Sequence, residues 1–455
     1  RAALQQTLAG EHAAVYVYGV LGGRVSASAQ GKFFPYPIKV EKLPNGFTVL
    51  RIPFNSPGLA AYYTVMRVGS RNEVEQGHTG FAHFFEHVMF KGTKKNPEGA
   101  RENVLAKLGF NDNAFTSDDV TVYTVFGPSS ALPTLIDLEA DRFKNLDFSE
   151  QTFQTEAKAV LGEYHKNAAR PELKMEEEMG VTAFTTHTYR HTTLGFYEDV
   201  QAMPSRYEYS KQFFKRWYTP DNALLVIVGD FDDGKTMELV KKAYGDWQGK
   251  SAQVQIPVEP EQKAPREVHI DWAQPTLPRH VLAWHTPAAR LNTNDYAIQA
   301  VLGAYLAGPT SPLYKDLVLE RQLVESISAG TNEHRDPNLF AFSATLKDEK
   351  NRADVQAAFD KALKDIVDGK VDARRVDDIK KNNRYGLLMG LETANAVAET
   401  VAWVVGIYGD PNAVEKEMEA VAKITPKDLT AFSKKYLVEQ NRTKLTLASK
   451  AGGAK

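Results

Sequence analysis

Cysteine is absent from the 455 residues of this chain. Its absence excludes disulfide bonds, and it also excludes zinc, iron–sulfur and thiol chemistry that depends on cysteine. Any metal site must therefore be built from His, Asp and Glu side chains. A chain without cysteine fits an export compartment. We expect a periplasmic or secreted protein, with the cytoplasm and the mitochondrial matrix as alternatives.

Long apolar runs and an excess of charge of one sign are also missing. No run approaches the roughly 18 apolar residues that a membrane-spanning helix needs, so we expect no membrane span. The 55 Lys and Arg residues nearly balance the 57 Asp and Glu residues. This balance provides no long-range attraction to nucleic acid or to an anionic membrane, and we expect no nucleic-acid partner. The remaining composition is globular, with 43% hydrophobic and 25% charged residues.

Residues 1–30 are predicted to be an N-terminal arm or a signal-like segment. A short apolar stretch at 13–23 is followed by Ala27-Ser28-Ala29, which is similar to the small-x-small cleavage site of a secretory signal. Arg1 is the only Lys or Arg before the apolar stretch. Because this is a poor positive region for a signal, an irregular arm stays open as the alternative.

Regular patterns of apolar residues begin after this segment. Asn45-Gly46, between two alternating apolar stretches, is a strong hairpin signal. The pattern predicts strands at 38–40, 47–52, 61–68, 121–126 and 223–228, and helices at 77–90, 98–108, 131–145 and 149–168. Residues 253–266 contain three prolines and little periodicity, and they are predicted to be a linker.

The order of elements starts again after the linker, with strands predicted near 268–271 and 280–284. A short internal echo supports two equivalent halves: Phe213 and Trp217 have aromatic counterparts, Phe432 and Tyr436, 219 positions later. We therefore predict an α+β fold of two homologous domains, at residues 31–252 and 267–455. Each domain is expected to be a mostly antiparallel sheet packed with helices.

The stretch His83-Phe84-Phe85-Glu86-His87 is the most informative one for chemistry. Residues four apart share one face of a helix, so His83 and His87 can offer their imidazoles to one ion. Two neutral imidazoles suit Zn²⁺, and Glu86 is placed to accept a proton from a water on the metal. The motif is short, and two incidental histidines beside a solvated glutamate are the alternative.

A catalytic zinc site takes a third protein ligand. Glu156 and Glu163 lie two turns apart on the helix predicted at 149–168, so both carboxylates face the same way. One of them can bind the metal while the other orients a ligand histidine. A solvated helix face is the alternative explanation for two such glutamates.

Several further stretches stand in a fixed order around this motif. They are Val68 to Glu73, Gly80 to Thr93, Asn113 to Asp118, Glu156, Glu163, His187, Tyr189, Gly195 and Tyr218 to Ala223. With them the chain resembles the pitrilysin-type zinc metallopeptidases of family M16, which carry the inverted motif H-x-x-E-H. It resembles most closely the two-domain subunits typical of the mitochondrial processing peptidase and its bacterial relatives.

The resemblance implies a role for each residue of the metal site. His83, His87 and Glu163 are expected to bind one zinc ion per chain, and Glu86 is expected to be the catalytic general base. Glu156 is expected to be the carboxylate that supports a ligand from behind. The implied activity is that of a zinc-dependent endopeptidase acting on peptides or unfolded segments.

The resemblance also implies how substrate is held. Asn113, Ala114 and Phe115 match the edge strand that pairs with the backbone of the substrate in this family. Two such units, on one chain or on two, close like a clamshell around a chamber. A non-catalytic scaffold or peptide-binding subunit of the same fold is the alternative function.

The second half of the chain departs from the family pattern. The family places an arginine there and a tyrosine seven residues later, which stabilise the oxyanion of the substrate. We expect this pair around residues 339–343, where no arginine occurs. The departure predicts a heterodimer with a homologous subunit that lacks H-x-x-E-H and supplies the pair. A homodimer, with Tyr305 or Tyr314 as the replacement, is the alternative.

Overall fold

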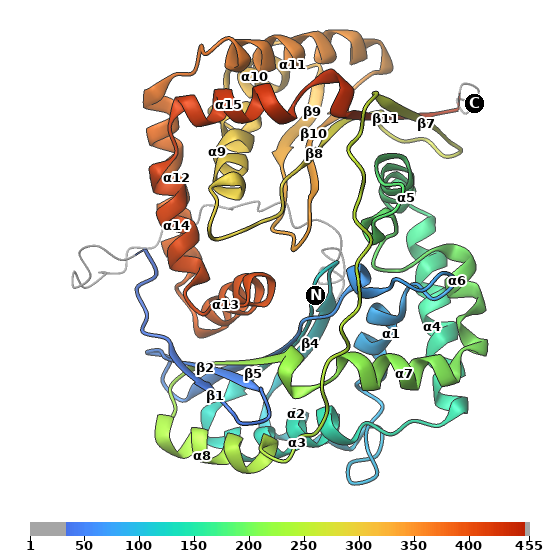
Figure 1. The fold of residues 1–455 in the computed structure, drawn as a ribbon, viewed down its shortest axis with the longest axis vertical. Coiled ribbons are helices and arrows are strands. Elements are labelled where there is room, and N and C mark those ends of the chain that lie inside the picture. Colours follow the sequence, from blue (N-terminus) through green and yellow to red (C-terminus); the bar gives the residue numbers. More distant parts are fainter. Residues whose placement is uncertain (1–32, 451–455) are drawn as a thin grey trace.

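The computed structural model describes residues 33–450, so the predicted arm or signal-like segment at 1–30 lies outside the described residues. Two β-sheets with their helices follow one another along the chain (Figure 1). The first sheet has the order β1-β2-β6-β3-β5-β4. Its strands are β1 (Lys39–Lys42), β2 (Thr48–Pro53), β3 (Leu59–Met66), β4 (Asn111–Thr116), β5 (Thr121–Pro128) and β6 (Ala223–Gly229).

The second sheet repeats this topology without an equivalent of β1, in the order β7-β11-β8-β10-β9. Its strands are β7 (Arg266–Trp272), β8 (Arg279–Thr286), β9 (Val324–Gly330), β10 (Asn338–Leu346) and β11 (Arg442–Ser449). One pair in each sheet is parallel, β2 with β6 and β7 with β11, and the other pairs are antiparallel. The predicted α+β class with two similar, mostly antiparallel sheets is confirmed.

The helices show the same repetition. The internal echo falls on α7 (Tyr207–Trp217) and α15 (Pro426–Tyr436), whose first and last residues are each 219 positions apart. Each helix leads through a short 3₁₀ turn into the second strand of the parallel pair, β6 or β11. The other helices are α1 (Phe81–Val88), α2 (Ala100–Leu108), α3 (Leu132–Asn145), α4 (Glu150–Ala168), α5 (Pro171–Ala183), α6 (Tyr197–Ala202), α8 (Asp233–Tyr244), α9 (Asp295–Ala307), α10 (Pro312–Tyr314), α11 (Arg352–Val367), α12 (Ala373–Gly390), α13 (Ala394–Tyr408) and α14 (Ala413–Lys423).

One helix from each half packs on the sheet of the other half. Helix α13 of the second half packs on the first sheet, where Val397 and Val401 are buried against residues of β3 and β6. Helix α5 of the first half lies against β7 and β11, with Met175 and Met179 on the second sheet (Figure 1). Each fully buried valine contributes roughly 1.5–3 kcal/mol to folding, so the exchange ties the halves together.

The exchange explains the pattern of the central strands. All seven residues of β6 are buried, because α7 and α8 lie on the side of the first core while α13 covers the opposite face. A strand covered on both faces has a continuous apolar sequence rather than an alternating one. Among residues 33–450, no helix combines the length and the apolar character needed to cross a membrane.

Candidate metal centre

Helix α1 presents two histidines on one face. His83 and His87 are one turn apart, and their ring centroids lie 4.8 Å from each other. The apolar spacing predicted a start at Gly77, but the helix starts at Phe81. The reason is that Gly77 and Gly80 have positive φ angles of 80° and 90°. Such angles belong to the left-handed region and interrupt a right-handed helix. His83 therefore lies in the first turn of α1.

Glu163 on α4 completes a group of three residues that could hold a metal ion. Its Oε2 atom lies 3.6 Å from His83 Nε2 and 3.3 Å from His87 Nε2, and the ligand atoms of all three residues lie within 4.8 Å of one another. Tetrahedral zinc with bonds of about 2.0–2.1 Å separates its ligand atoms by roughly 3.3–3.4 Å. The donor set and its spacing therefore fit zinc.

The electrostatics of the three residues favour a cation at this point. Burial, together with neighbouring His87, lowers the pKa of His83 to about 4, so its imidazole is neutral near pH 7 and free to act as a ligand. Burial also opposes charge on His87, but the Glu163 carboxylate outweighs this effect and raises the pKa of His87. The hydrogen bond from His87 lowers the pKa of Glu163 and keeps this carboxylate ionised.

Glu86 lies one residue before His87 on the same helix. Its carboxylate accepts a hydrogen bond of 2.6 Å from the Thr116 hydroxyl, at the end of β4. Burial raises the pKa of Glu86 above its ordinary value, against the opposing effects of Thr116 and His87. A carboxylate with a raised pKa is a better general base near neutral pH. Thr116 belongs to the stretch that resembles the family, but no role for it was predicted from the sequence.

Glu156 lies on the side of the His87 ring that faces away from Glu163. Its Oε2 atom lies 4.0 Å from Nδ1 of His87, the ring nitrogen opposite the one that faces Glu163. The other oxygen of Glu156 forms a 2.8 Å salt bridge with Lys91. The position is the one expected for a carboxylate that orients a ligand histidine. Lys91, which fixes this carboxylate, was not recognised from the sequence.

Strand β4 places Asn113, Ala114 and Phe115 at the edge of the first sheet. The strand pairs with β5 on one side only, and Asn113 pairs with Thr124. Successive side chains point to opposite faces. Thr116 donates its hydrogen bond to Glu86 of α1, whereas Phe115 packs with the α13 core on the other face. An edge strand that ends at the proposed base is suited to align an extended peptide.

The residues 339–343, where the oxyanion pair was expected, lie in β10. Phe340 and Phe342 are fully buried in the second core, and β10 is paired on both sides, with β8 and β9. Tyr305 is also committed to the second half, because its hydroxyl accepts a hydrogen bond from the Asp372 N–H. Its ring lies 4.0 Å from the guanidinium carbon of Arg375.

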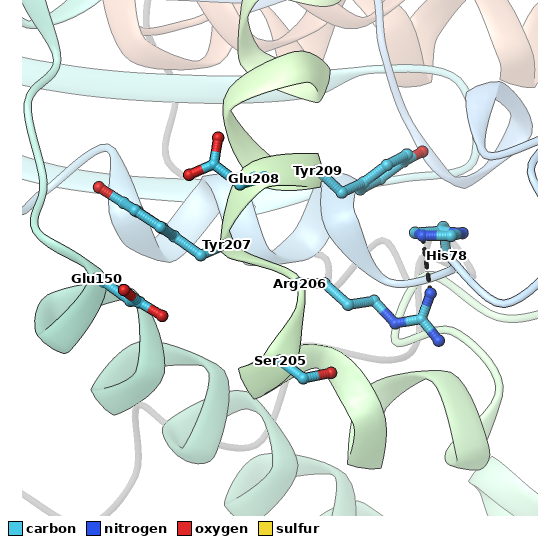
Figure 2. Close-up of a pocket in the computed structure, with 7 residues that line it drawn as sticks. All are labelled: His78, Glu150, Ser205, Arg206, Tyr207, Glu208 and Tyr209. Atoms are coloured by element: carbon cyan, nitrogen blue, oxygen red, sulfur yellow. Dashed lines mark hydrogen bonds between the residues drawn. The ribbon is translucent and has the colours of Figure 1, made fainter.

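A surface pocket of about 450 Å³ lies apart from the metal group, around the first residues of α4 and α7 (Figure 2). None of the metal-site residues lines this pocket. Two hydrogen bonds hold His78 within it: Nε2 accepts from Arg206 at 2.7 Å, and Nδ1 donates to the Gln76 carbonyl at 3.0 Å. Its ring also packs against Tyr209, with centroids 4.1 Å apart and ring planes tilted by 37°. The contacts give His78 a structural role.

Two protein-family models match the chain. The model described as insulinase (peptidase family M16) matches residues 60–195, and the model described as the peptidase M16 inactive domain matches residues 206–383. Together they cover more than half of the chain, and the second model begins within the first half, before β6 of the first sheet. The chain belongs to the M16 family of peptidases.

Individual relatives cover nearly the whole chain. The zinc protease PqqE of Helicobacter pylori is 26% identical, over 89% of this chain and 91% of the relative. The probable mitochondrial-processing peptidase subunit beta of Schizosaccharomyces pombe is 24% identical, over 88% of each. The crystal structure of a protease from Helicobacter pylori has a TM-score of 0.83 at 25% identity, over 90% of this chain and 99% of that one.

One neighbour in fold is longer than this chain. The periplasmic protease PqqL from Escherichia coli has a TM-score of 0.75 at 18% identity, and the match covers 91% of this chain but 48% of PqqL. This likeness shows the fold. About half of PqqL therefore corresponds to both halves of the present chain.

Proposed function

We propose that this chain is a zinc-dependent endopeptidase subunit that cleaves peptides or unfolded segments. The observation that carries the proposal is the convergence of His83, His87 and Glu163, with Glu86 beside them and bonded to the end of an edge strand. The names of the relatives PqqE and PqqL support a protease, and that of PqqE supports zinc.

The residues divide the reaction between them. A peptide paired with β4 has its backbone fixed next to Glu86, which accepts a hydrogen bond from Thr116 at the end of that strand. Zinc held by His83, His87 and Glu163 would polarise the scissile carbonyl and acidify the attacking water. Glu86 accepts the proton of that water and delivers it to the amine that leaves. Glu156 and Lys91 keep the His87 ring in place during both steps.

The experiment that tests this proposal is metal removal. We expect the purified protein to cleave an unstructured peptide, to lose at least 90% of the rate after dialysis against a chelator (an estimate of roughly one order of magnitude), and to regain the rate when stoichiometric Zn²⁺ is added. Mg²⁺ serves as the control, because it prefers oxygen ligands and does not suit two imidazoles. Cleavage that persists in metal-free protein would contradict the proposal.

The partner belongs to the proposal as well. The expected oxyanion pair is missing from 339–343, so we propose a heterodimer with a homologous subunit that supplies an arginine and a tyrosine. The length of PqqL, about twice that of this chain, supports the pairing of two such units. A homodimer is the alternative arrangement, and the periplasm or the cell exterior is the proposed compartment.

This pairing predicts low activity for the chain on its own. Loss of one oxyanion donor typically costs about 10²–10³-fold in kcat. We therefore expect the pure chain, with its oligomeric state established by light scattering, to gain about that factor when the homologous subunit is added. An unchanged kcat after addition of that subunit would rule out the heterodimer and favour the homodimer.

A non-catalytic subunit of the same fold is the second candidate function. It is favoured by the description of the model that matches residues 206–383, which is that of an inactive domain. That range lies outside the metal site, which is formed entirely by residues before 164. The complete ligand set therefore favours the peptidase.

A further inference from the structure

The helix that carries both histidines has no N-terminal cap of its own. The residue before its first turn is Gly80, which has no side chain to accept a hydrogen bond from the backbone. The first N–H groups of a helix have no partner within the helix and require one elsewhere. His83 belongs to this first turn, so whatever holds the turn also holds a ligand of the metal site.

The side chain of Glu73 takes the place of the missing cap. Its Oε2 accepts the Gly80 N–H at 2.7 Å, and its Oε1 accepts the Ala82 N–H at 2.6 Å. Both distances are at or below the short end of the range for charge-assisted hydrogen bonds. Glu73 is 2% exposed, and it comes from the segment just after the 3₁₀ turn at Ser70–Asn72. One carboxylate thus accepts hydrogen bonds from two backbone N–H groups at the start of α1.

The charge of Glu73 has a consequence for a cation on His83. The N-terminus of a helix carries about half a positive charge, which disfavours a cation in the first turn, and a carboxylate at that end offsets it. Burial raises the pKa of Glu73 to about 8, while the N–H groups of Ala82 and Gly80 lower it. Among residues 33–450, the basic side chain within 4.0 Å of the Glu73 carboxylate is His191, whose Nδ1 lies 3.8 Å from Oε2 of Glu73. Burial lowers the pKa of His191 to about 4, so its ring is neutral near pH 7 and does not offset the negative charge of the Glu73 carboxylate.

We propose that Glu73 is a positioning residue of the zinc site, which fixes the first turn of α1 and offsets the positive end of the helix beneath His83. The inference rests on the proposed function, because it concerns the same zinc ion. It assigns to a residue ten positions before the first ligand a direct influence on metal affinity. Glu73 acts through the backbone of α1 and not by touching the metal or the substrate.

The test compares Glu73→Gln with the matched control Glu75→Gln. Glu75 lies two residues further on, and its side chain pairs with Arg216 and Tyr209 on α7 rather than with the backbone N–H groups of α1. The glutamine side chain of Glu73→Gln keeps one acceptor and places an amide N–H₂ against the other backbone donor. At about pH 8.5, above the pKa of about 8 of Glu73 so that most of this carboxyl is ionised, we expect Glu73→Gln to weaken zinc binding about tenfold in competition with a chromogenic chelator. Glu75→Gln is expected to bind zinc like the wild type.

Two further readouts separate this role from general stabilisation. A purely structural residue lowers the melting temperature equally with and without zinc, whereas we expect zinc to raise the Tm of Glu73→Gln less than that of the wild type. The visible bands of Co²⁺ in the site should also change in Glu73→Gln and not in Glu75→Gln. Glu73→Asp keeps the charge with a shorter reach, and its zinc affinity should lie between those of the wild type and Glu73→Gln.

The outcomes are distinguishable. A wild-type protein that binds no zinc would overturn the proposed function itself. If the wild type binds zinc, and both Glu73 variants show the same zinc affinity and the same zinc-induced Tm shift as the wild type, the role of Glu73 is overturned and the proposed function stays intact.

Discussion

Replacement of Glu86 by glutamine is expected to abolish turnover while zinc stays bound. The amide is nearly the same size as the carboxylate and can keep the contact with Thr116, so His83 and His87 hold their positions. It cannot accept the proton of the attacking water, and loss of a general base typically costs about 10²–10⁴-fold in rate. The expected signature is a kcat lowered by about that factor with the zinc content unchanged.

The measurement combines steady-state cleavage of an unstructured peptide with elemental analysis of the same preparation. Glu208→Gln is the matched control, since Glu208 is an exposed glutamate of α7 that pairs with Lys211. It should leave both quantities at the wild-type level. If Glu86→Gln, with zinc bound, kept more than a small fraction of the wild-type kcat, Glu86 would not be the base.

Replacement of Glu163 by glutamine is expected to cause the largest loss of zinc affinity. The change removes the anionic ligand whose Oε2 lies between the two imidazoles, 3.6 and 3.3 Å from their Nε2 atoms. Glu156→Gln should weaken binding less, by about 10–100-fold, because Glu156 acts on His87 from the opposite side of the ring. The order of affinities is therefore wild type, Glu156→Gln and Glu163→Gln, from tightest to weakest.

Competition with a chromogenic chelator measures the three zinc affinities under one set of conditions. Both variants place an amide on the same face of α4, so the two changes are closely matched in size and helix propensity. Equal zinc loss in the two variants would mean that the third ligand is misassigned. A greater loss in Glu156→Gln than in Glu163→Gln would exchange their roles.

The sequence predicts most elements of the first half because their patterns are local. The Asn45-Gly46 signal predicts the β1–β2 hairpin, and the helical spacing at 131–145 and 149–168 gives α3 and α4 to within one residue at each end. Gly109, in the left-handed region, ends α2 at Leu108, where the helix predicted at 98–108 also ends. The 219-position echo identifies the repeated unit of helix and strand. Family membership is confirmed by the two matching models.

The features that the sequence does not predict depend on contacts between distant segments. The helices α5 and α13 cover sheets of the opposite half, and nothing in their own patterns indicates which sheet they meet. Helix α1 begins four residues later than its apolar spacing suggests, because the angles of Gly77 and Gly80 depend on the surrounding fold. Thr116 and Lys91 belong to the site through single hydrogen bonds that only the folded chain reveals. The site residues themselves could be proposed because H-x-x-E-H and the two glutamates of α4 lie on regular helices.

The zinc content of the purified chain tests the central claim most directly. Protein that has been freed of metal, supplied with a small excess of Zn²⁺ and desalted is analysed for metal and for protein in the same sample. Because each chain contains one group formed by His83, His87 and Glu163, we predict about one zinc ion per chain, retained in Glu86→Gln and lost in a double variant of the two histidines. A wild-type chain that retains no zinc, or a double histidine variant that retains as much zinc as the wild type, would contradict the account.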